Sequence, residues 1–321
     1  MTVLRPRSGP PQPAQRVFEL RPRPSFRLDL TAWALRRRAQ NAIDTWDGRS
    51  YRRALVISGT AYEASVTQVS SEVRPRLEAV LSGPRVGPAE EAAARSTLAR
   101  LLGLDVDLSG FYARAAHDRL LDELAERYRG VKPPRFPTIF ECLLNAIACQ
   151  QLSLAAGLTL LSRLAATAGA AAGALHAFPA PTDVLRLSQS HLRALGFSER
   201  KVETILELAD AAAAGELEAD VFERLDDAAV VEALVQRRGV GPWSADYVLL
   251  RGLGRLHVFP RGDSGALTGL RRFLVGTELE DDPDAALARW PADAGLVYFH
   301  LLLRGLEQRV AGFQRLETRA S

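Results

Sequence analysis

From Ala89 to Val310 the chain repeats apolar residues at the three- and four-residue spacing of α-helices, almost without a break. Residues typical of helix ends divide this run: Asp118, Thr182 and Ser198 are placed as N-caps, and Pro242 stands at a first helical position. The pattern predicts helices at 89–102, 109–116, 118–128, 138–151, 153–168, 182–195, 199–214, 221–238, 242–253, 264–274 and 292–310. Residues 85–315 are therefore expected to form an all-helical domain.

The segment before residue 85 follows a different pattern. Residues 1–15 are rich in proline and arginine, which predicts a disordered tail. Phe26, Leu28 and Leu30 alternate with polar residues as in a strand, and residues 31–42 have helical spacing. The runs 51–57 and 61–69 are β-branched or aromatic and are separated by Ser58-Gly59, a hairpin signature. We expect residues 16–84 to form a small α+β domain built on an antiparallel sheet.

Composition excludes several classes of protein. The 321 residues are 47% hydrophobic and 25% charged, as in an ordinary globular protein of about two domains. Two cysteines, Cys142 and Cys149, exclude a disulfide framework, a four-cysteine zinc site and a cysteine-ligated iron–sulfur cluster, and the five histidines lack the spacing of metal ligands. No apolar run suits a signal peptide or a membrane span. We expect a cytoplasmic protein, a monomer, with no catalytic metal and no membrane partner.

Basic residues are concentrated at the front of the chain. The sequence isoelectric point is about 9.1, and Lys132 and Lys201 are the only lysines beside the many arginines. Through Arg53 there are twelve arginines and four acidic residues. A GC-rich genome accounts for much of the preference for arginine over lysine. The charge asymmetry itself indicates a polyanionic partner.

The sharpest local motif is Val-Gln-Arg-Arg-Gly-Val-Gly-Pro-Trp-Ser-Ala at 235–245, between two predicted helices. Gly239 and Gly241 allow a tight turn and leave backbone N–H groups open at the start of the second helix, where a phosphate can bind. The alternative is an ordinary helix-ending glycine before a helix that starts with proline. Val240 between the glycines, and Ser244 packed behind them, favour a helix-hairpin-helix at 228–254 whose Gly239, Val240, Gly241 and Ser244 contact DNA.

Twenty residues after Trp243, Asp263 lies in the loop Phe-Pro-Arg-Gly-Asp-Ser-Gly. Alone, Asp263 could simply cap the next helix. Together with the hairpin, this spacing resembles the helix-hairpin-helix DNA glycosylase superfamily, and in particular its alkylation-repair branch, DNA-3-methyladenine glycosylase II. The segments 105–112, 140–153 and 192–202 resemble that branch in the same order, so that the resemblance covers about residues 16–312.

This resemblance implies a monofunctional DNA N-glycosylase of base excision repair, which flips alkylated, cationic purines such as 3-methyladenine out of damaged double-stranded DNA and hydrolyses their glycosidic bond. Asp263 matches the catalytic carboxylate, which would stabilise the positive charge that develops on the sugar. Trp243 and Tyr247 match pocket positions, with core packing as the alternative for Tyr247. Gln150, Gln151 and Leu152 match the turn that fills the vacated base stack, with Gln151 as the plug and an ordinary polar helix end as the alternative for Gln150.

The resemblance also implies a fold: mainly α, a two-lobed helix-hairpin-helix glycosylase domain with a small N-terminal α+β domain. No cofactor is implied, although hairpin carbonyl oxygens can hold a monovalent cation. One departure concerns the pocket: after Trp290, the chain lacks the aromatic residue and the arginine that the family usually carries there.

Two alternatives stay open. One is a non-catalytic helix-hairpin-helix protein that binds lesions. The other is an oxidised-purine glycosylase, whose strand-nicking lysine is replaced here by Trp243.

Overall fold

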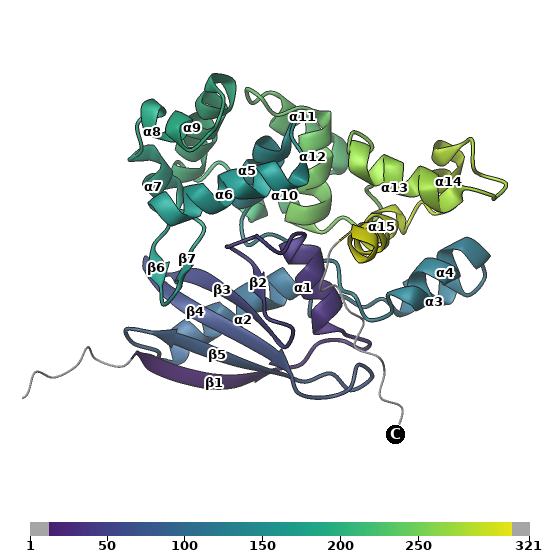
Figure 1. The fold of residues 1–321 in the computed structure, drawn as a ribbon, viewed down its shortest axis with the longest axis horizontal. Helices are drawn as coiled ribbons and strands as arrows, with labels where there is room; N and C mark the ends of the chain where they lie inside the picture. Colours follow the sequence, from purple (N-terminus) through teal and green to yellow (C-terminus); the bar gives the residue numbers. More distant parts are fainter. Residues whose placement is uncertain (1–12, 310–321) are drawn as a thin grey trace, which may run out of the picture.

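The computed structural model describes residues 13–309 and confirms a mainly helical chain with a small antiparallel sheet near its N-terminus. The sheet lies below the helical body in Figure 1. Its strands are β1 (Ala14–Leu20), β2 (Thr45–Trp46), β3 (Ser50–Ile57), β4 (Thr60–Gln68) and β5 (Leu77–Gly83), in the order β1-β5-β4-β3-β2. Residues 1–12 of the predicted tail lie outside the described residues. The tail was predicted to extend too far, because Ala14 and Gln15 already belong to β1.

The predicted hairpin at Ser58-Gly59 is confirmed. It joins β3 to β4 with Ile57 paired to Thr60. Both turn residues have positive φ angles, 48° at Ser58 and 76° at Gly59. Two successive residues with positive φ give a turn that matches the twist of the flanking strands, and this is why the serine-glycine pair predicts a hairpin.

The strand predicted from Phe26, Leu28 and Leu30 is wrong, because helix α1 (Leu28–Arg36) begins at Leu28. This helix takes the place of the predicted 31–42 helix and ends six residues before its predicted end. Helix α1 lies between two hydrophobic clusters. Leu28 and Leu35 pack with the sheet and with α2 (Pro88–Leu102), whereas Leu30 and Trp33 pack with the C-terminal helices. A helix buried on both sides has apolar residues at spacings of two as well as three and four, and this imitates a strand.

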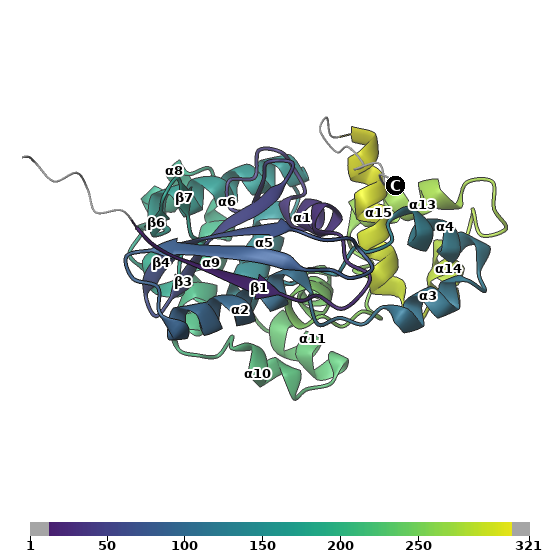
Figure 2. The ribbon, with the colours of Figure 1, turned by 90° about the horizontal axis from the view of Figure 1, so that it is seen from below.

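The helical body has two lobes, each with its own core. One lobe is built from α5 (Ile139–Cys149), α6 (Leu154–Ala168), α7 (Pro181–Leu185), α8 (Gln189–Ala194), α9 (Glu199–Ala213), α10 (Ala219–Glu223), α11 (Asp227–Val235), α12 (Pro242–Val248) and the π-helical turn η1 (Leu249–Leu253). The other contains α3 (Ser109–Ala115), α4 (Arg119–Arg127), α13 (Ser264–Leu274), α14 (Pro283–Arg289) and α15 (Ala294–Arg309). Figure 2 shows α3, α4, α13 and α14 grouped beside α15.

Several predicted helices need correction. The predicted helix 182–195 is α7 and α8, because the Ser188 side chain accepts a hydrogen bond from His191 N and starts a new helix. The predicted helix 221–238 is α10 and α11, divided by Asp226, which caps α11 in the same way. The apolar spacing runs across both breaks because the successive helices pack on one core. Helix α14 and the small hairpin β6 (Ala171–Ala172) and β7 (Leu175–His176) were not predicted.

A buried ionic cluster joins the sheet to the first lobe. Arg53 on β3 donates hydrogen bonds to Asp44 Oδ1 at 2.8 Å and to the carboxylate of Glu141 on α5 at 2.6 Å. All three side chains are no more than 4% exposed. The sheet is thus fixed to α5, whose C-terminal end enters the cavity described next. Within the described part of the chain, no helix is long and apolar enough to cross a bilayer.

Candidate active site

A cavity of about 1030 Å³ lies where the two lobes meet the end of α1. Its walls come from the ends of α1 and α5, the start of α6, α12, the loop before α13, α13 itself and α15 from Tyr298 onward. Asp263 is the one acidic residue among the described residues that line it. Five arginines also line it: Arg37, Arg38, Arg272, Arg304 and Arg309.

The helix-hairpin-helix motif borders this cavity through α12. Gly239 has a left-handed φ of 75°, and a Cβ there would lie 2.2 Å from Thr204 Oγ1 on α9, so that only glycine fits. Val240 is 5% exposed and packs into the first core. Gly241 has extended backbone and open space where a Cβ would stand. The hairpin is therefore anchored at Gly239 and Val240 and open at Gly241.

The turn between α5 and α6 lies against the hairpin. The Gln150 amide donates to the Gly239 carbonyl at 3.0 Å and to Ser244 Oγ at 3.1 Å. Lys201 Nζ donates to the carbonyl oxygens of Ala148 and Gln150, which holds the C-terminal end of α5. With Gln150 held inward, the next residues of the turn are left exposed.

Gln151 and Leu152 are those exposed residues. Gln151 has a φ of 55°, which is uncommon for a residue other than glycine, and such strain is often found at functional positions. The Leu152 side chain is 46% exposed beside the cavity. The DNA contacts predicted for Gln150, Gln151 and Leu152 stay predictions.

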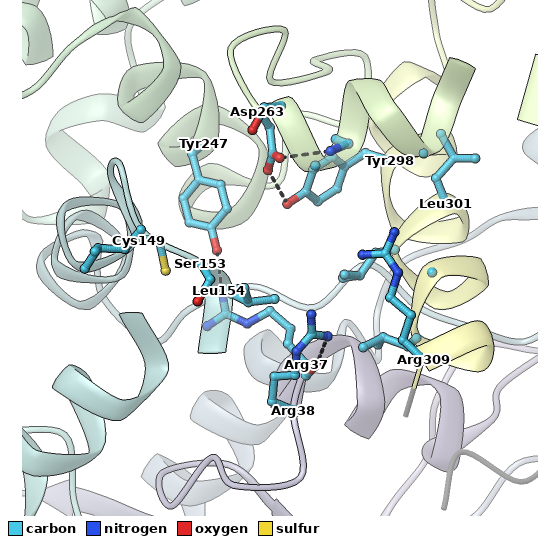
Figure 3. Close-up of a pocket in the computed structure, with 18 of the residues that line it drawn as sticks. Arg37, Arg38, Cys149, Ser153, Leu154, Tyr247, Asp263, Tyr298, Leu301 and Arg309 are labelled. Atoms are coloured by element: carbon cyan, nitrogen blue, oxygen red, sulfur yellow. Dashed lines mark hydrogen bonds between the residues drawn. The ribbon is translucent and has the colours of Figure 1, made fainter. Parts of the chain in front are cut away.

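Asp263 caps a helix and also faces the cavity. Its Oδ1 accepts a hydrogen bond from Ala266 N at 2.9 Å, so the N-cap interpretation holds. Its Oδ2 accepts a hydrogen bond from the Tyr298 hydroxyl at 3.3 Å (Figure 3). Burial, followed by the Asp263 charge, raises the pKa of Tyr298 well above its ordinary value, so this hydroxyl stays a donor. Asp263 therefore caps α13 and also faces the cavity, and its catalytic role stays a prediction.

Trp243 and Tyr247 form one wall of the cavity. Their ring centroids are 5.8 Å apart, as residues one helical turn apart on α12. Trp243 Nε1 is buried with no hydrogen-bond partner among the described residues. Tyr247 is 4% exposed and belongs to the first core, yet its hydroxyl reaches the cavity side and accepts a hydrogen bond from Arg37. Tyr247 therefore packs in the core and also lines the cavity, and its contact with a substrate stays a prediction.

The cavity residues that the sequence did not predict include Arg37, Asn145 and Tyr298. Arg37 comes from the small α+β region and is one of three consecutive arginines, so no local signal distinguishes it. Asn145 is, beside Glu141, a buried polar residue in the largely apolar helix α5, which is a signal that could have been used. Tyr298 lies on α15 eight residues after Trp290, beyond the segment in which the family usually carries its aromatic residue.

The segment that follows Trp290 stabilises the fold. Trp290 Nε1 donates to Asp118 Oδ2 at 2.9 Å, and Asp293 accepts two hydrogen bonds from Arg114. These bonds fix the start of α15 to α3 and α4, and neither residue lines the cavity. Tyr298 therefore supplies the aromatic side chain that α15 adds to the wall.

The described residues contain no group of three or more side chains that could hold a metal ion. At the hairpin, the Gly239 carbonyl accepts a hydrogen bond from Gln150, and the Arg237 carbonyl accepts one from Val240 N. Each carbonyl keeps a second lone pair. A monovalent cation at this turn stays a prediction.

The middle of the chain is similar to known proteins of base excision DNA repair. Residues 144–289 match the HhH-GPD superfamily of base excision DNA repair proteins. A putative DNA-3-methyladenine glycosylase, YfjP, from Bacillus subtilis is 29% identical over 163 residues, which are 51% of this chain and 56% of the relative. The chain thus spans little more than half the length of this curated relative.

Solved structures share the fold over most of the chain. A 3-methyladenine DNA-glycosylase from Archaeoglobus fulgidus aligns with a TM-score of 0.77 and 24% identity, covering 92% of this chain and 100% of that one. A Clostridium acetobutylicum 8-oxoguanine glycosylase/lyase in complex with double-stranded DNA aligns with a TM-score of 0.68 and 16% identity, covering 92% and 99%. At these identities the likeness establishes the fold.

Proposed function

We propose that the protein is a monofunctional DNA N-glycosylase, from the premise that residues 144–289 match the HhH-GPD superfamily of base excision DNA repair proteins. It flips a damaged purine out of the duplex into the cavity between the lobes and hydrolyses the glycosidic bond. Its substrates include alkylated, cationic purines such as 3-methyladenine, in agreement with the names of its relatives.

The observation that carries the proposal is the position of Asp263 in the cavity. Cleavage of a glycosidic bond develops positive charge on the sugar, and an ionised carboxylate beside C1′ stabilises that charge. Asp263 is the one acidic residue among the described residues of the cavity wall, and two hydrogen bonds fix its orientation. A protein that only binds lesions has no use for a carboxylate on a surface that meets phosphates.

The aromatic wall supports an alkylated purine. The rings of Trp243 and Tyr247 present electron-rich faces, which attract a cationic base. A purine alkylated at N3 or N7 is already cationic, and it leaves as a neutral base once the bond breaks. No strong general acid is needed, which fits the absence of a second carboxylate among the described lining residues.

Water is the nucleophile that the lining residues favour. A strand-nicking glycosylase attacks C1′ with an amine. Lys132 Nζ is bound to the Val106 carbonyl, Lys201 Nζ holds the end of α5, and neither lysine lines the cavity. Trp243 stands where the lyase members of the superfamily carry the lysine.

For DNA binding we propose two elements. The open face at Gly241, with the backbone N–H groups of the first turn of α12, would seat a phosphate without reading a base. Gln151, projecting from the strained turn after α5, would occupy the space left by the flipped nucleotide.

The experiment is incubation of the protein with duplex oligonucleotides that each carry one lesion: 7-methylguanine, ethenoadenine, hypoxanthine or 8-oxoguanine. We expect release of the free base and an abasic strand that breaks only on alkali treatment. Strand breakage without alkali, or a covalent adduct trapped by borohydride, would favour the oxidised-purine alternative. Lesion binding without release of any base would favour the non-catalytic one.

A further inference from the structure

The turn between α5 and α6 is held by a single ammonium group, the Nζ of Lys201 on α9. We propose that Lys201 is a positioning residue for base flipping, which fixes the backbone of this turn in the shape that directs Gln151 toward the space left by the flipped nucleotide. This inference rests on the glycosylase function proposed above, and it concerns the step before the glycosidic bond breaks.

The carbonyl groups at the end of α5 explain the contact. The last turn of a helix leaves carbonyl oxygens without partners inside the helix. In α5, the N–H of Gln150 donates to the carbonyls of Ala146 and Ile147 at 3.0 and 3.3 Å. The carbonyl of Ala148 accepts instead from Lys201 Nζ at 3.0 Å, and the same nitrogen donates to the carbonyl of Gln150 at 2.9 Å. One ammonium group therefore joins the end of the helix to the turn that follows it.

The charge of Lys201 acts on α5 and not on its own helix. Lys201 lies in the first turn of α9, where its backbone N–H donates to the side chain of the N-cap Ser198 at 3.4 Å. A positive charge is unfavourable at the N-terminal end of a helix and favourable at the C-terminal end. No carboxylate of the described residues forms an ion pair with Lys201. Its ammonium group is thus bound to the two backbone carbonyls at the end of α5.

The residue type fits this contact. The chain has 41 lysines and arginines, of which only Lys132 and Lys201 are lysines. Lys132 also binds the backbone, through the Val106 carbonyl at 2.7 Å. An ammonium group carries three donors on one compact atom and can bond two carbonyls at once, whereas a guanidinium is a wider planar fork. In a chain that otherwise uses arginine, both lysines stand where a compact donor binds backbone oxygen.

Gln151 directly follows the carbonyl that Lys201 holds. Its φ of 55° is strained for a residue other than glycine, and such strain persists only where the surroundings fix it. The Gln151 residue is exposed, so the fixing contacts come from its neighbours. The Gln150 amide binds the hairpin at Gly239, and Lys201 binds the backbone of Gln150. Loss of the Lys201 ammonium releases one of these two contacts and lets Gln151 relax toward an ordinary backbone conformation.

This effect is confined to flipping. A side chain that fills the vacated stack stabilises the flipped nucleotide, and it does not touch the bond that breaks. Lys201 is not among the described residues that line the cavity. An effect that passes through Gln151 should therefore depend on how stably the lesion is paired, because a mismatched base costs less to open.

The test measures single-turnover release of 7-methylguanine, or of whichever lesion the unaltered protein releases, from a paired and from a mismatched duplex. We expect Lys201→Met to slow release from the paired lesion by about tenfold, because hydrogen bonds to a charged group are lost, and from the mismatch by about threefold or less. Lys201→Arg keeps a charged donor and should be faster than Lys201→Met on the paired lesion. Adding Lys201→Met to Gln151→Ala should slow release by no more than about twofold beyond Gln151→Ala alone, because both act through one side chain.

A fluorescent base supplies a direct measure of flipping. With 2-aminopurine placed beside the lesion, fluorescence rises when the neighbouring base leaves the stack. At equal DNA occupancy, Lys201→Met should give a smaller rise than the unaltered protein on the paired lesion. A variant that is merely less stable has no reason to change this signal well below its Tm.

Two variants are matched controls. Arg200→Met removes the neighbouring charge on α9, on an exposed residue, and leaves Lys201 in place. Any slowing should be equal for paired and mismatched lesions, since only general DNA affinity falls. Lys132→Met removes the other ammonium that binds a carbonyl and should lower Tm without changing the ratio of the two rates. If Lys201→Met is unfolded by thermal melting, the same ratio in Lys201→Gln, which keeps a neutral donor, decides.

The outcomes separate the inference from the proposed function. Equal slowing of paired and mismatched lesions in Lys201→Met, full multiplication of the two losses in the double variant, or no gain in rate from Lys201→Arg would overturn the inference and leave the glycosylase function standing. A ratio that changes equally in Lys132→Met would overturn it as well, because the effect would then follow stability. Release of no base from any lesion duplex by the unaltered protein would overturn the proposed function itself.

Discussion

Asp263 combines two functions that two substitutions can separate. Asp263→Asn keeps an oxygen that can accept the hydrogen bond from Ala266 N, so α13 stays capped, but it removes the charge that faces the sugar. Asp263→Ala removes both. Loss of one oriented group that stabilises transition-state charge costs about 2.7–4 kcal/mol, or roughly a hundred- to a thousandfold in rate. We expect this loss in both variants, with DNA binding retained.

Stability should distinguish the two variants. Loss of an N-cap costs about 1 kcal/mol, which lowers Tm by about 2–4 °C in a protein of this size. Only Asp263→Ala should show that shift. A matched control is Asp282→Asn, since Asp282 caps α14 through Ala285 N at 2.8 Å and does not line the cavity.

The assay is single-turnover release of 7-methylguanine, together with binding to undamaged duplex and thermal melting. Asp282→Asn should change neither rate nor Tm. A loss smaller than about tenfold in Asp263→Asn, or about 1.4 kcal/mol of barrier, would refute the catalytic assignment. The assignment would also be refuted if activity fell only in the variant whose Tm falls, because the carboxylate would then act only by stabilising the fold.

Two further substitutions test the proposed DNA contacts. Gly241→Val has space for its side chain, so its Tm should not change. Its binding to undamaged and to damaged duplex should weaken equally, and the affinity should depend less on salt. An effect on lesion DNA alone would make the hairpin part of the base pocket. Gln151→Ala should slow release more from a stably paired lesion than from the same lesion in a mismatch, which costs less to open, and equal losses would argue against a plug.

The parts of the fold that were predictable from the sequence depend on local chemistry. Ser58-Gly59 set the hairpin turn, and Asp118 and Ser198 form the predicted N-cap hydrogen bonds. Errors arose where packing overrides the local pattern. Helix α1 has two buried sides, so its spacing imitated a strand, and the apolar run through Asp226 hid a break between two helices on one core.

The candidate site divides in the same way. Asp263, Trp243 and Tyr247 stand in motifs with fixed spacing along one stretch of chain, and the structure brings all three to one cavity. Arg37 reaches that cavity from a region more than two hundred residues away in sequence. Its place depends on how the sheet and α1 dock on the lobes. Tertiary docking leaves no periodic signal, so the place of Arg37 at the cavity could not be read from the sequence.

This docking leads to a last prediction, for the buried cluster of Arg53, Asp44 and Glu141. The cluster holds two carboxylates and one guanidinium, and Tyr51 donates a further hydrogen bond to Asp44 at 2.7 Å. Burial raises the pKa of Glu141, against the effect of Arg53. Arg53→Met leaves two carboxylates buried without a cation, which should cost about 3–5 kcal/mol and lower Tm by roughly 6–20 °C.

Glu141→Gln should be far milder, because Arg53 and Asp44 remain as a balanced pair and the amide can still accept a hydrogen bond. Adding Glu141→Gln to Arg53→Met should recover part of the lost Tm, since one unpaired carboxylate is removed. None of the three residues lines the cavity, so base release well below Tm should be unchanged in every variant. If the double variant melts no higher than Arg53→Met, unpaired charge is not the cause of the loss. The sheet would then be held to α5 by shape and apolar packing instead.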